Sequence, residues 1–163
     1  MLYRWLVFLH ILGAFGFLLA HGGSVNATFR VRREQTLDGL RAVLQLSNSS
    51  FTLMYVSLLL MLLAGIASGF IGQWWGRGWI WASLAVLLAT AVGMFFLATG
   101  FFNRLRRSAG LPWFDGRREH AAEPPAPHEE LMQLQVSGRP VLTSVLGLLP
   151  IALILWLMVF KPF

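Results

Sequence analysis

Residues 5–29, WLVFLHILGAFGFLLAHGGSVNATF, decide the fold of this 163-residue chain. About 20 helical residues cross a hydrocarbon core of roughly 30 Å, so this run is long enough to span a membrane. The run contains two histidines, His10 and His21. A helix advances about 1.5 Å and 100° per residue, which places both rings on nearly one face, roughly 16 Å apart. Because lipid cannot solvate an imidazole, we expect both rings to face protein.

A stripe of small residues runs beside the histidine face of this helix. It consists of Gly13, Gly16, Ala20, Gly23 and Ala27. In lipid, helices associate largely through close backbone contact at such small residues. We therefore expect this side to pack on neighbouring helices, while Leu, Ile and Phe side chains face lipid.

The composition predicts an integral membrane protein, since 56% of the residues are hydrophobic, 12% are charged and the mean hydropathy is +0.65. Three more apolar runs follow, at about 51–71, 79–102 and 141–160. Together the four runs predict an all-α, four-span antiparallel bundle that forms a single domain, 1–163, with long loops at 30–50 and 103–140. The absence of cysteine excludes disulfides and thiolate metal sites.

The distribution of basic residues predicts the orientation. Of the 13 Lys and Arg residues, ten fall in the loops 30–50 and 103–140 and three on the opposite side. Cytoplasmic loops carry such an excess, so we expect both long loops in the cytoplasm and both termini outside a bacterial inner membrane. Four tryptophans crowd residues 74–81, a position typical of the headgroup level. Because the formal charge of +6 follows from this topology, we expect no nucleic-acid partner.

The connections carry their own signals. Leucines at helical spacing in 37–46 predict either an amphipathic surface helix or a continuation of the first span. The cluster Ser47-Asn48-Ser49-Ser50 is typical of a helix cap and predicts that the second span begins directly after it. In the long loop, 121–127 predicts an extended linker and 129–136 a short amphipathic helix behind Pro127. We expect residues 138–140 to break that helix and Pro150 to kink the last span.

Two interpretations of His10 and His21 are open. In one, these residues are cofactor or metal ligands, either holding haem b iron or passing copper along the helix with the help of methionine. In the other, each ring is neutral and hydrogen-bonded to a hydroxyl or carbonyl on the next helix. The candidate soft ligands are Met54, Met61, Met94 and Met158. The remaining histidines, His120 and His128, lie in the long loop, so a haem clamped by two histidines of one subunit is not expected.

Basic residues at the end of the first span suggest an anion site. Arg30 lies one turn after Asn26 and close to Arg33. Such a group fits an anionic lipid headgroup or the propionate edge of a haem, and it also fits ordinary anchoring of a span. Arg30 is therefore a candidate cofactor-binding residue.

The opening residues 3–17, YRWLVFLHILGAFGF, resemble the first helix of a group of small four-span bacterial membrane proteins. The group includes copper resistance protein D, the HemJ-type protoporphyrinogen oxidase and a related uncharacterised integral membrane family. The resemblance is carried by Trp5, Leu9, His10, Gly13, Gly16 and Arg30. The ending LMVFKPF, 157–163, resembles the uncharacterised family, which is the most similar of the three. The resemblance implies a haem held by His10, although the intramembrane lysine of the oxidases is absent.

These observations favour a non-catalytic bacterial inner-membrane protein that binds haem or copper at His10, as a homodimer or as an accessory subunit of a larger membrane complex. The alternatives are a haem-dependent oxidoreductase of the protoporphyrinogen-oxidase type and a copper-handling channel. None of the four apolar runs contains Asp, Glu, Lys or Arg. Ion-coupled transporters usually need a buried carboxylate, so the sequence argues against a pump.

Overall fold

The computed structural model describes residues 1–115, 117–137 and 139–163, and most of them are helical. In chain order the helices are α1 (Leu2–Val31), α2 (Leu37–Ile71), α3 (Gly78–Met94), a π-helical turn η2 (Phe95–Thr99), α4 (Gly100–Ser108), α5 (His128–Val136) and α6 (Arg139–Phe160). A short 3-10 turn, η1 (Trp74–Gly76), joins α2 to α3. Two short strands, β1 (Trp113–Phe114) and β2 (Glu119–His120), pair antiparallel.

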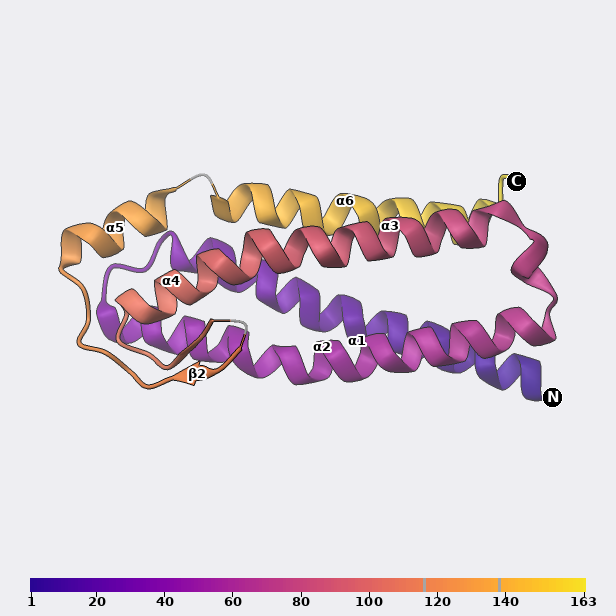
Figure 1. Cartoon of the computed structure of the whole chain (residues 1–163), viewed down its shortest axis with the longest axis horizontal. Coiled ribbons are helices and arrows are strands. Elements are labelled where there is room, and N and C mark those ends of the chain that lie inside the picture. Colours follow the sequence, from indigo (N-terminus) through magenta and orange to yellow (C-terminus); the bar gives the residue numbers. More distant parts are fainter. Residues whose placement is uncertain (116, 138) are drawn as a thin grey trace.

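Four helical segments of the described chain are long and apolar enough to cross a membrane. They are Leu2–Val31, Leu37–Ile71, Gly78–Ser108 and His128–Phe160. Figure 1 shows them as antiparallel rods with both termini at the same end of the molecule. The prediction of an all-helical chain with four such helices is therefore confirmed.

The long helices form two layers, one made by α1 and α2 and the other by α3 and α6 (Figure 1). Within each layer the two helices pack side by side. Between the layers the contacts are far fewer: α6 touches α1 at a small number of positions, and α2 and α3 hardly meet apart from the turn that joins them. The layers are instead tied together at the two ends of the molecule.

Small residues allow α1 to lie against α2, as the stripe on the first span predicts. A Cβ atom added at Gly13 would lie 2.6 Å from the backbone nitrogen of Met61, and one at Gly16 would collide with the hydroxyl of Ser57. Ala20 and Ala27, further along the stripe, are buried. Close backbone contact therefore holds this layer together.

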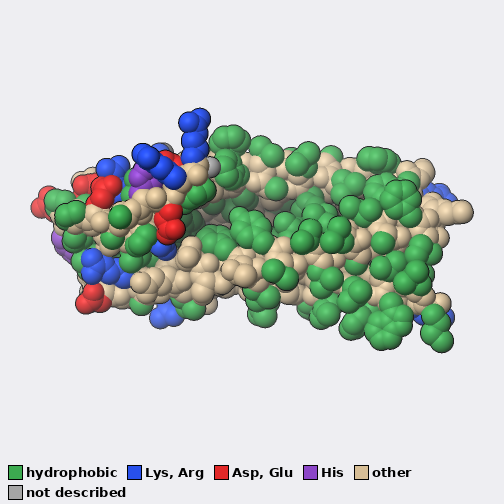
Figure 2. Space-filling model, turned by 60° about the horizontal axis from the view of Figure 1, so that its bottom comes forward, with side chains coloured by type: hydrophobic (Ala, Val, Ile, Leu, Met, Phe, Trp, Pro, Cys, Tyr) green, Lys and Arg blue, Asp and Glu red, His purple; other side chains and the backbone are tan. Residues whose placement is uncertain are grey.

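A hydrophobic core closes the arginine-rich end of the molecule, and we call this end the head (residues 27–47, 101–115 and 117–137). Its buried members come from α1, α2, α4, the following loop and α5: Ala27, Val31, Leu40, Val43, Leu44, Phe101, Leu105, Ala109, Leu111 and Leu131. Leu105, at its centre, is 0% exposed. On the face shown in Figure 2, most charged side chains gather over this end, while hydrophobic side chains are spread over the rest of the molecule.

The loop expected at 30–50 is almost entirely helical. After Val31 only a short turn intervenes before α2 begins at Leu37, capped by Thr36, whose hydroxyl accepts the Gly39 N–H at 3.2 Å. The leucines of 37–46 extend the second span rather than the first, because they bury one face in the head core. The prediction of a cap at 47–50 is wrong.

The serines of that cluster lie inside α2. The Ser49 and Ser50 hydroxyls donate to the Leu46 carbonyl at 2.8 and 3.2 Å. Serine is tolerated within a helix when its hydroxyl bonds a carbonyl three or four residues back. These serines are therefore of a residue type that often caps helices, but they lie inside α2 rather than at its start.

The second long connection also starts later than expected, because α3 continues through η2 and α4 to Ser108. Ala85 and Ala89, two small residues one turn apart in this span, are exposed rather than packed. Residues 121–127 have no regular secondary structure and α5 begins directly after Pro127, as predicted. Of the break expected at 138–140, residue 138 lies outside the described residues, while residues 139 and 140 already belong to α6.

Candidate functional site

His10 is held between α1 and α2 by a backbone carbonyl. Its Nδ1 lies 2.7 Å from the carbonyl oxygen of Met61. A carbonyl only accepts, so Nδ1 carries the hydrogen and the lone pair of the neutral ring is on Nε2. Gly65 makes room for the ring, since a Cβ there would lie 2.7 Å from Nδ1. Metal-binding histidines have this arrangement, one ring nitrogen fixed by a carbonyl and the other available to the metal.

His21 lies deeper, where α1 meets the second layer. Its side chain is 9% exposed and stacks on Phe17, with ring centroids 5.8 Å apart. Its Nε2 is buried without a hydrogen-bond partner. A Cβ added at Gly147 of α6 would lie 2.8 Å from this Nε2 and 3.7 Å from Cε of Met94. The ring nitrogen of His21 and the methyl end of the Met94 side chain therefore both approach the backbone of Gly147.

Both rings face protein, as expected, but they face different helices. His10 bonds α2 and His21 meets α6 and α3, so a single ion cannot bind both. Across residues 1–115, 117–137 and 139–163, no group of three or more His, Cys, Asp or Glu side chains is placed to hold a metal ion.

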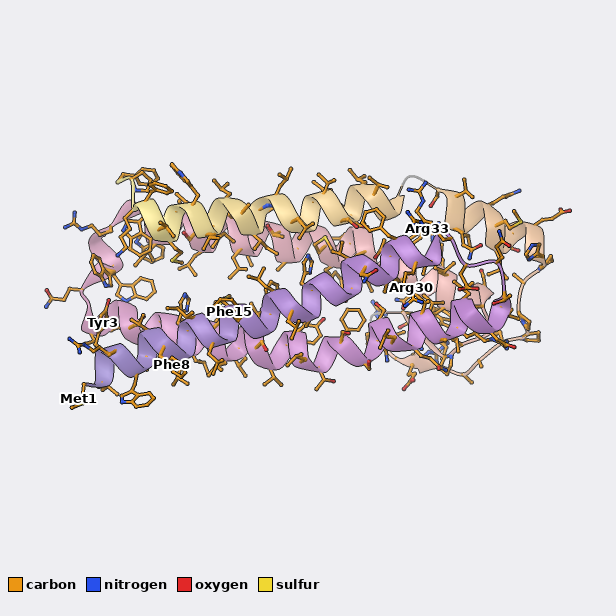
Figure 3. The ribbon with its side chains drawn as sticks, turned by 180° about the vertical axis from the view of Figure 1, so that it is seen from behind. Met1, Tyr3, Phe8, Phe15, Arg30 and Arg33 are labelled. Atoms are coloured by element: carbon orange, nitrogen blue, oxygen red, sulfur yellow. The ribbon has the colours of Figure 1, made fainter. Side chains whose placement is uncertain are left out.

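Arg30 is not brought to either histidine. It is exposed in the last turn of α1, and Figure 3 shows Arg30 and Arg33 at the opposite end of this helix from Met1 and Tyr3. The helical rise places Arg30 about 30 Å along the axis from His10 and about 14 Å from His21. Arg30 and His10 therefore cannot hold the same cofactor.

The histidine of the hairpin β1–β2, His120, packs and bonds within the hairpin itself. His120 stacks on Trp113 at 4.2 Å between centroids, and its Nε2 lies 2.7 Å from a carboxylate oxygen of Asp115. The other oxygen of Asp115 accepts the backbone N–H groups of Arg117 and Arg118. The hydrogen bond with His120, and then those two amides, hold the pKa of Asp115 well below its ordinary value.

Several polar side chains of the head bond backbone carbonyls, and the sequence pattern did not single them out. Gln135 is buried and donates to the carbonyls of Val31 and Glu34 at 3.0 and 3.1 Å. Arg41 donates to the Ala109 carbonyl at 2.8 Å. The available signal was Gln135 itself, a lone amide four residues after Leu131 on the apolar face of a short helix.

Aromatic residues close the opposite end of the molecule. The Trp74 indole donates to the Tyr3 hydroxyl at 3.3 Å, which ties η1 to α1. The Lys161 ammonium lies 4.5 Å from the Trp74 ring and 5.6 Å from the Trp79 ring, within the range of cation–π attraction. We call this the tryptophan border (Trp74, Trp75, Trp79 and Trp81). It fastens α6 to the turn between the layers.

No protein-family model, curated protein or solved structure matches this chain. The resemblance of residues 3–17 to the first helix of the copper resistance and HemJ-type proteins therefore stays a prediction, and the functional argument depends on the geometry around the two histidines.

Proposed function

We propose that this chain is a non-catalytic, multi-pass protein of the bacterial inner membrane that binds haem or copper through Nε2 of His10. The observation that supports this most directly is the 2.7 Å bond from Nδ1 of His10 to the Met61 carbonyl. That bond fixes the tautomer and leaves an unprotonated ring nitrogen for iron or copper.

The lengths of the helices support a membrane position for His10. Roughly 20 helical residues cross the hydrocarbon core, whereas α1 has 30 residues and α2 has 35. With the tryptophan border at one headgroup level, both helices extend beyond the other membrane face, and the head lies outside the hydrocarbon. His10 follows the start of α1 by about 12 Å along the axis and so lies within the apolar layer.

The surroundings support cofactor binding without catalysis. The apolar runs 5–29, 51–71, 79–102 and 141–160 contain no Asp, Glu, Lys or Arg. An oxidoreductase that also moves protons on and off its substrate gains much of its rate from a positioned acid or base. His10 has no such partner, so the bound group serves as a carried cofactor or as an electron relay in a larger complex.

The test is to purify the full chain from a bacterial membrane and record its absorption spectrum and metal content. We expect a Soret band, or one copper ion per chain, that is lost in His10→Ala. His128→Ala is the matched control, because His128 is exposed at the start of α5. A colourless, metal-free wild-type protein, or an unchanged signal in His10→Ala, contradicts the proposal.

A further inference from the structure

Two buried polar atoms of α1, one turn apart, have no hydrogen-bond partner. Nε2 of His21 is buried, and the side chain as a whole is more than nine-tenths buried. The hydroxyl oxygen of Ser24, one turn along α1, is also buried and unbonded. Buried polar groups nearly always have a partner, so two orphans within one turn indicate a ligand at this position.

The surroundings of Nε2 define what that ligand is. Gly147 leaves the position next to the ring without a side chain, and the methyl group of Met94 reaches the same position from α3. Pro150 has no N–H, so the carbonyl of Leu146 in α6 lacks its usual helical donor. The imidazole of His21 and the thioether side chain of Met94 approach this position. The Ser24 hydroxyl lies one turn along α1, the Leu146 carbonyl directly precedes Gly147 in α6, and none of these groups is charged.

This set of donors selects a soft monovalent metal ion. Calcium and magnesium prefer carboxylate oxygens, and structural zinc takes four ligands, mostly thiolate and imidazole. Thioether and imidazole together suit copper(I), and a single positive charge is the least costly to place where no acid balances it. We propose that Nε2 of His21 and the sulfur of Met94 hold one copper(I) ion at the layer contact. This site uses another histidine than the His10 proposal and stands independently of it.

The experiment titrates the purified full chain with copper(I) under reducing conditions, against a coloured competing chelator. All variants carry His10→Ala, so that metal at His10 does not contribute. We expect one copper(I) per chain in this background, loss of that ion on adding His21→Ala, and at least tenfold weaker binding on adding Met94→Leu. Met158→Leu is the methionine control and leaves the affinity unchanged.

Met94→Leu also keeps the test valid if His21→Ala fails to fold, because it conserves volume in an apolar contact. X-ray absorption of the copper-loaded protein should show a sulfur neighbour that Met94→Leu removes. The proposal is overturned if the His10→Ala protein binds no copper(I), or if Met94→Leu leaves both affinity and sulfur signal intact. Loss of the Soret band in His10→Ala with copper(I) binding retained separates the two sites.

Discussion

At the scale of single residues, two glycines of α1 differ sharply in what surrounds them. A side chain at Gly13 meets the backbone of Met61, which cannot move aside, whereas a Cβ atom added at Gly22 would meet nothing within 4 Å. We expect Gly13→Ala to lower the free energy of unfolding by about 1–3 kcal/mol through overpacking. Gly22→Ala should leave it unchanged or raise it by up to about 1 kcal/mol through helix propensity. Unfolding in mixed micelles measures both, and equal effects would contradict close packing at Gly13.

Asp115 makes the hairpin β1–β2 sensitive to acid. Its folded-state pKa lies below the ordinary value of 3.8, chiefly because of the hydrogen bond with His120. A depressed carboxylate pKa stabilises the folded state fully above the unfolded pKa, and this stabilisation is lost as the pH falls through the folded pKa. We therefore expect amide exchange at Arg117 and Arg118, corrected for its intrinsic pH dependence, to lose protection only below about pH 4.

The variant Asp115→Asn should remove this pH dependence and weaken the protection at every pH at which the Asp115 carboxylate is ionised. Asp38→Asn is the control, because the Asp38 side chain is 95% exposed. If protection of the two amides is the same in wild type and Asp115→Asn, the hairpin does not depend on this carboxylate.

At the scale of elements, α5 is fastened to the head by one amide side chain. Gln135→Ala leaves the carbonyls of Val31 and Glu34 without their donor, and each unpaired buried carbonyl costs about 1–3 kcal/mol. We expect faster hydrogen exchange in 31–36 and faster proteolysis within 121–127. Gln133→Ala, an exposed change on the same helix, should alter neither. Matching behaviour of the two variants would show that Gln135 does not hold α5 in place.

The sequence predicts the helices only over their apolar segments, where hydropathy identifies a membrane span. The apolar runs place the central part of each span correctly, and Pro127 places the start of α5. The leucine spacing predicted a helix at 37–46 but did not join it to the second span, and the helix at 103–108 was missed, because polar side chains interrupt the hydropathy in both places. What stabilises these segments as extensions of the spans is burial of Leu40, Leu44 and Leu105 against other elements, a tertiary effect that hydropathy alone does not contain.

The candidate site could be predicted in part. The helical period and the free-energy cost of placing an imidazole without a hydrogen-bond partner in lipid were enough to predict that His10 and His21 face protein. The partners were not predictable, because the Met61 carbonyl and Gly147 belong to elements 51 and 126 residues further along the chain. Spacing alone also could not show that two residues on one face of α1 meet different helices, which follows from how the layers are arranged.

At the scale of the whole molecule, the placement of arginine predicts the topology. Because basic loops are retained in the cytoplasm, we expect a reporter fused after Phe163 to lie outside the cytoplasm and a reporter inserted within 121–127 to lie inside it. Each position is tested with two reporters, a phosphatase that is active only outside the cytoplasm and a fluorescent protein that is fluorescent only inside it. Fluorescence without phosphatase activity in the fusions after Phe163 would contradict the predicted orientation.

Helix α2 is a single unbroken rod that takes part in both end closures. Leu40 and Leu44 anchor it in the head, and Gly69 lies against Trp75 of the tryptophan border. With 35 residues it is about 52 Å long, so a swing of about 5° around its midpoint displaces each tip by roughly 2 Å. Because α2 contains no proline between these anchors, we expect it to move as one rigid rod that couples a displacement at the basic end to one at the aromatic end.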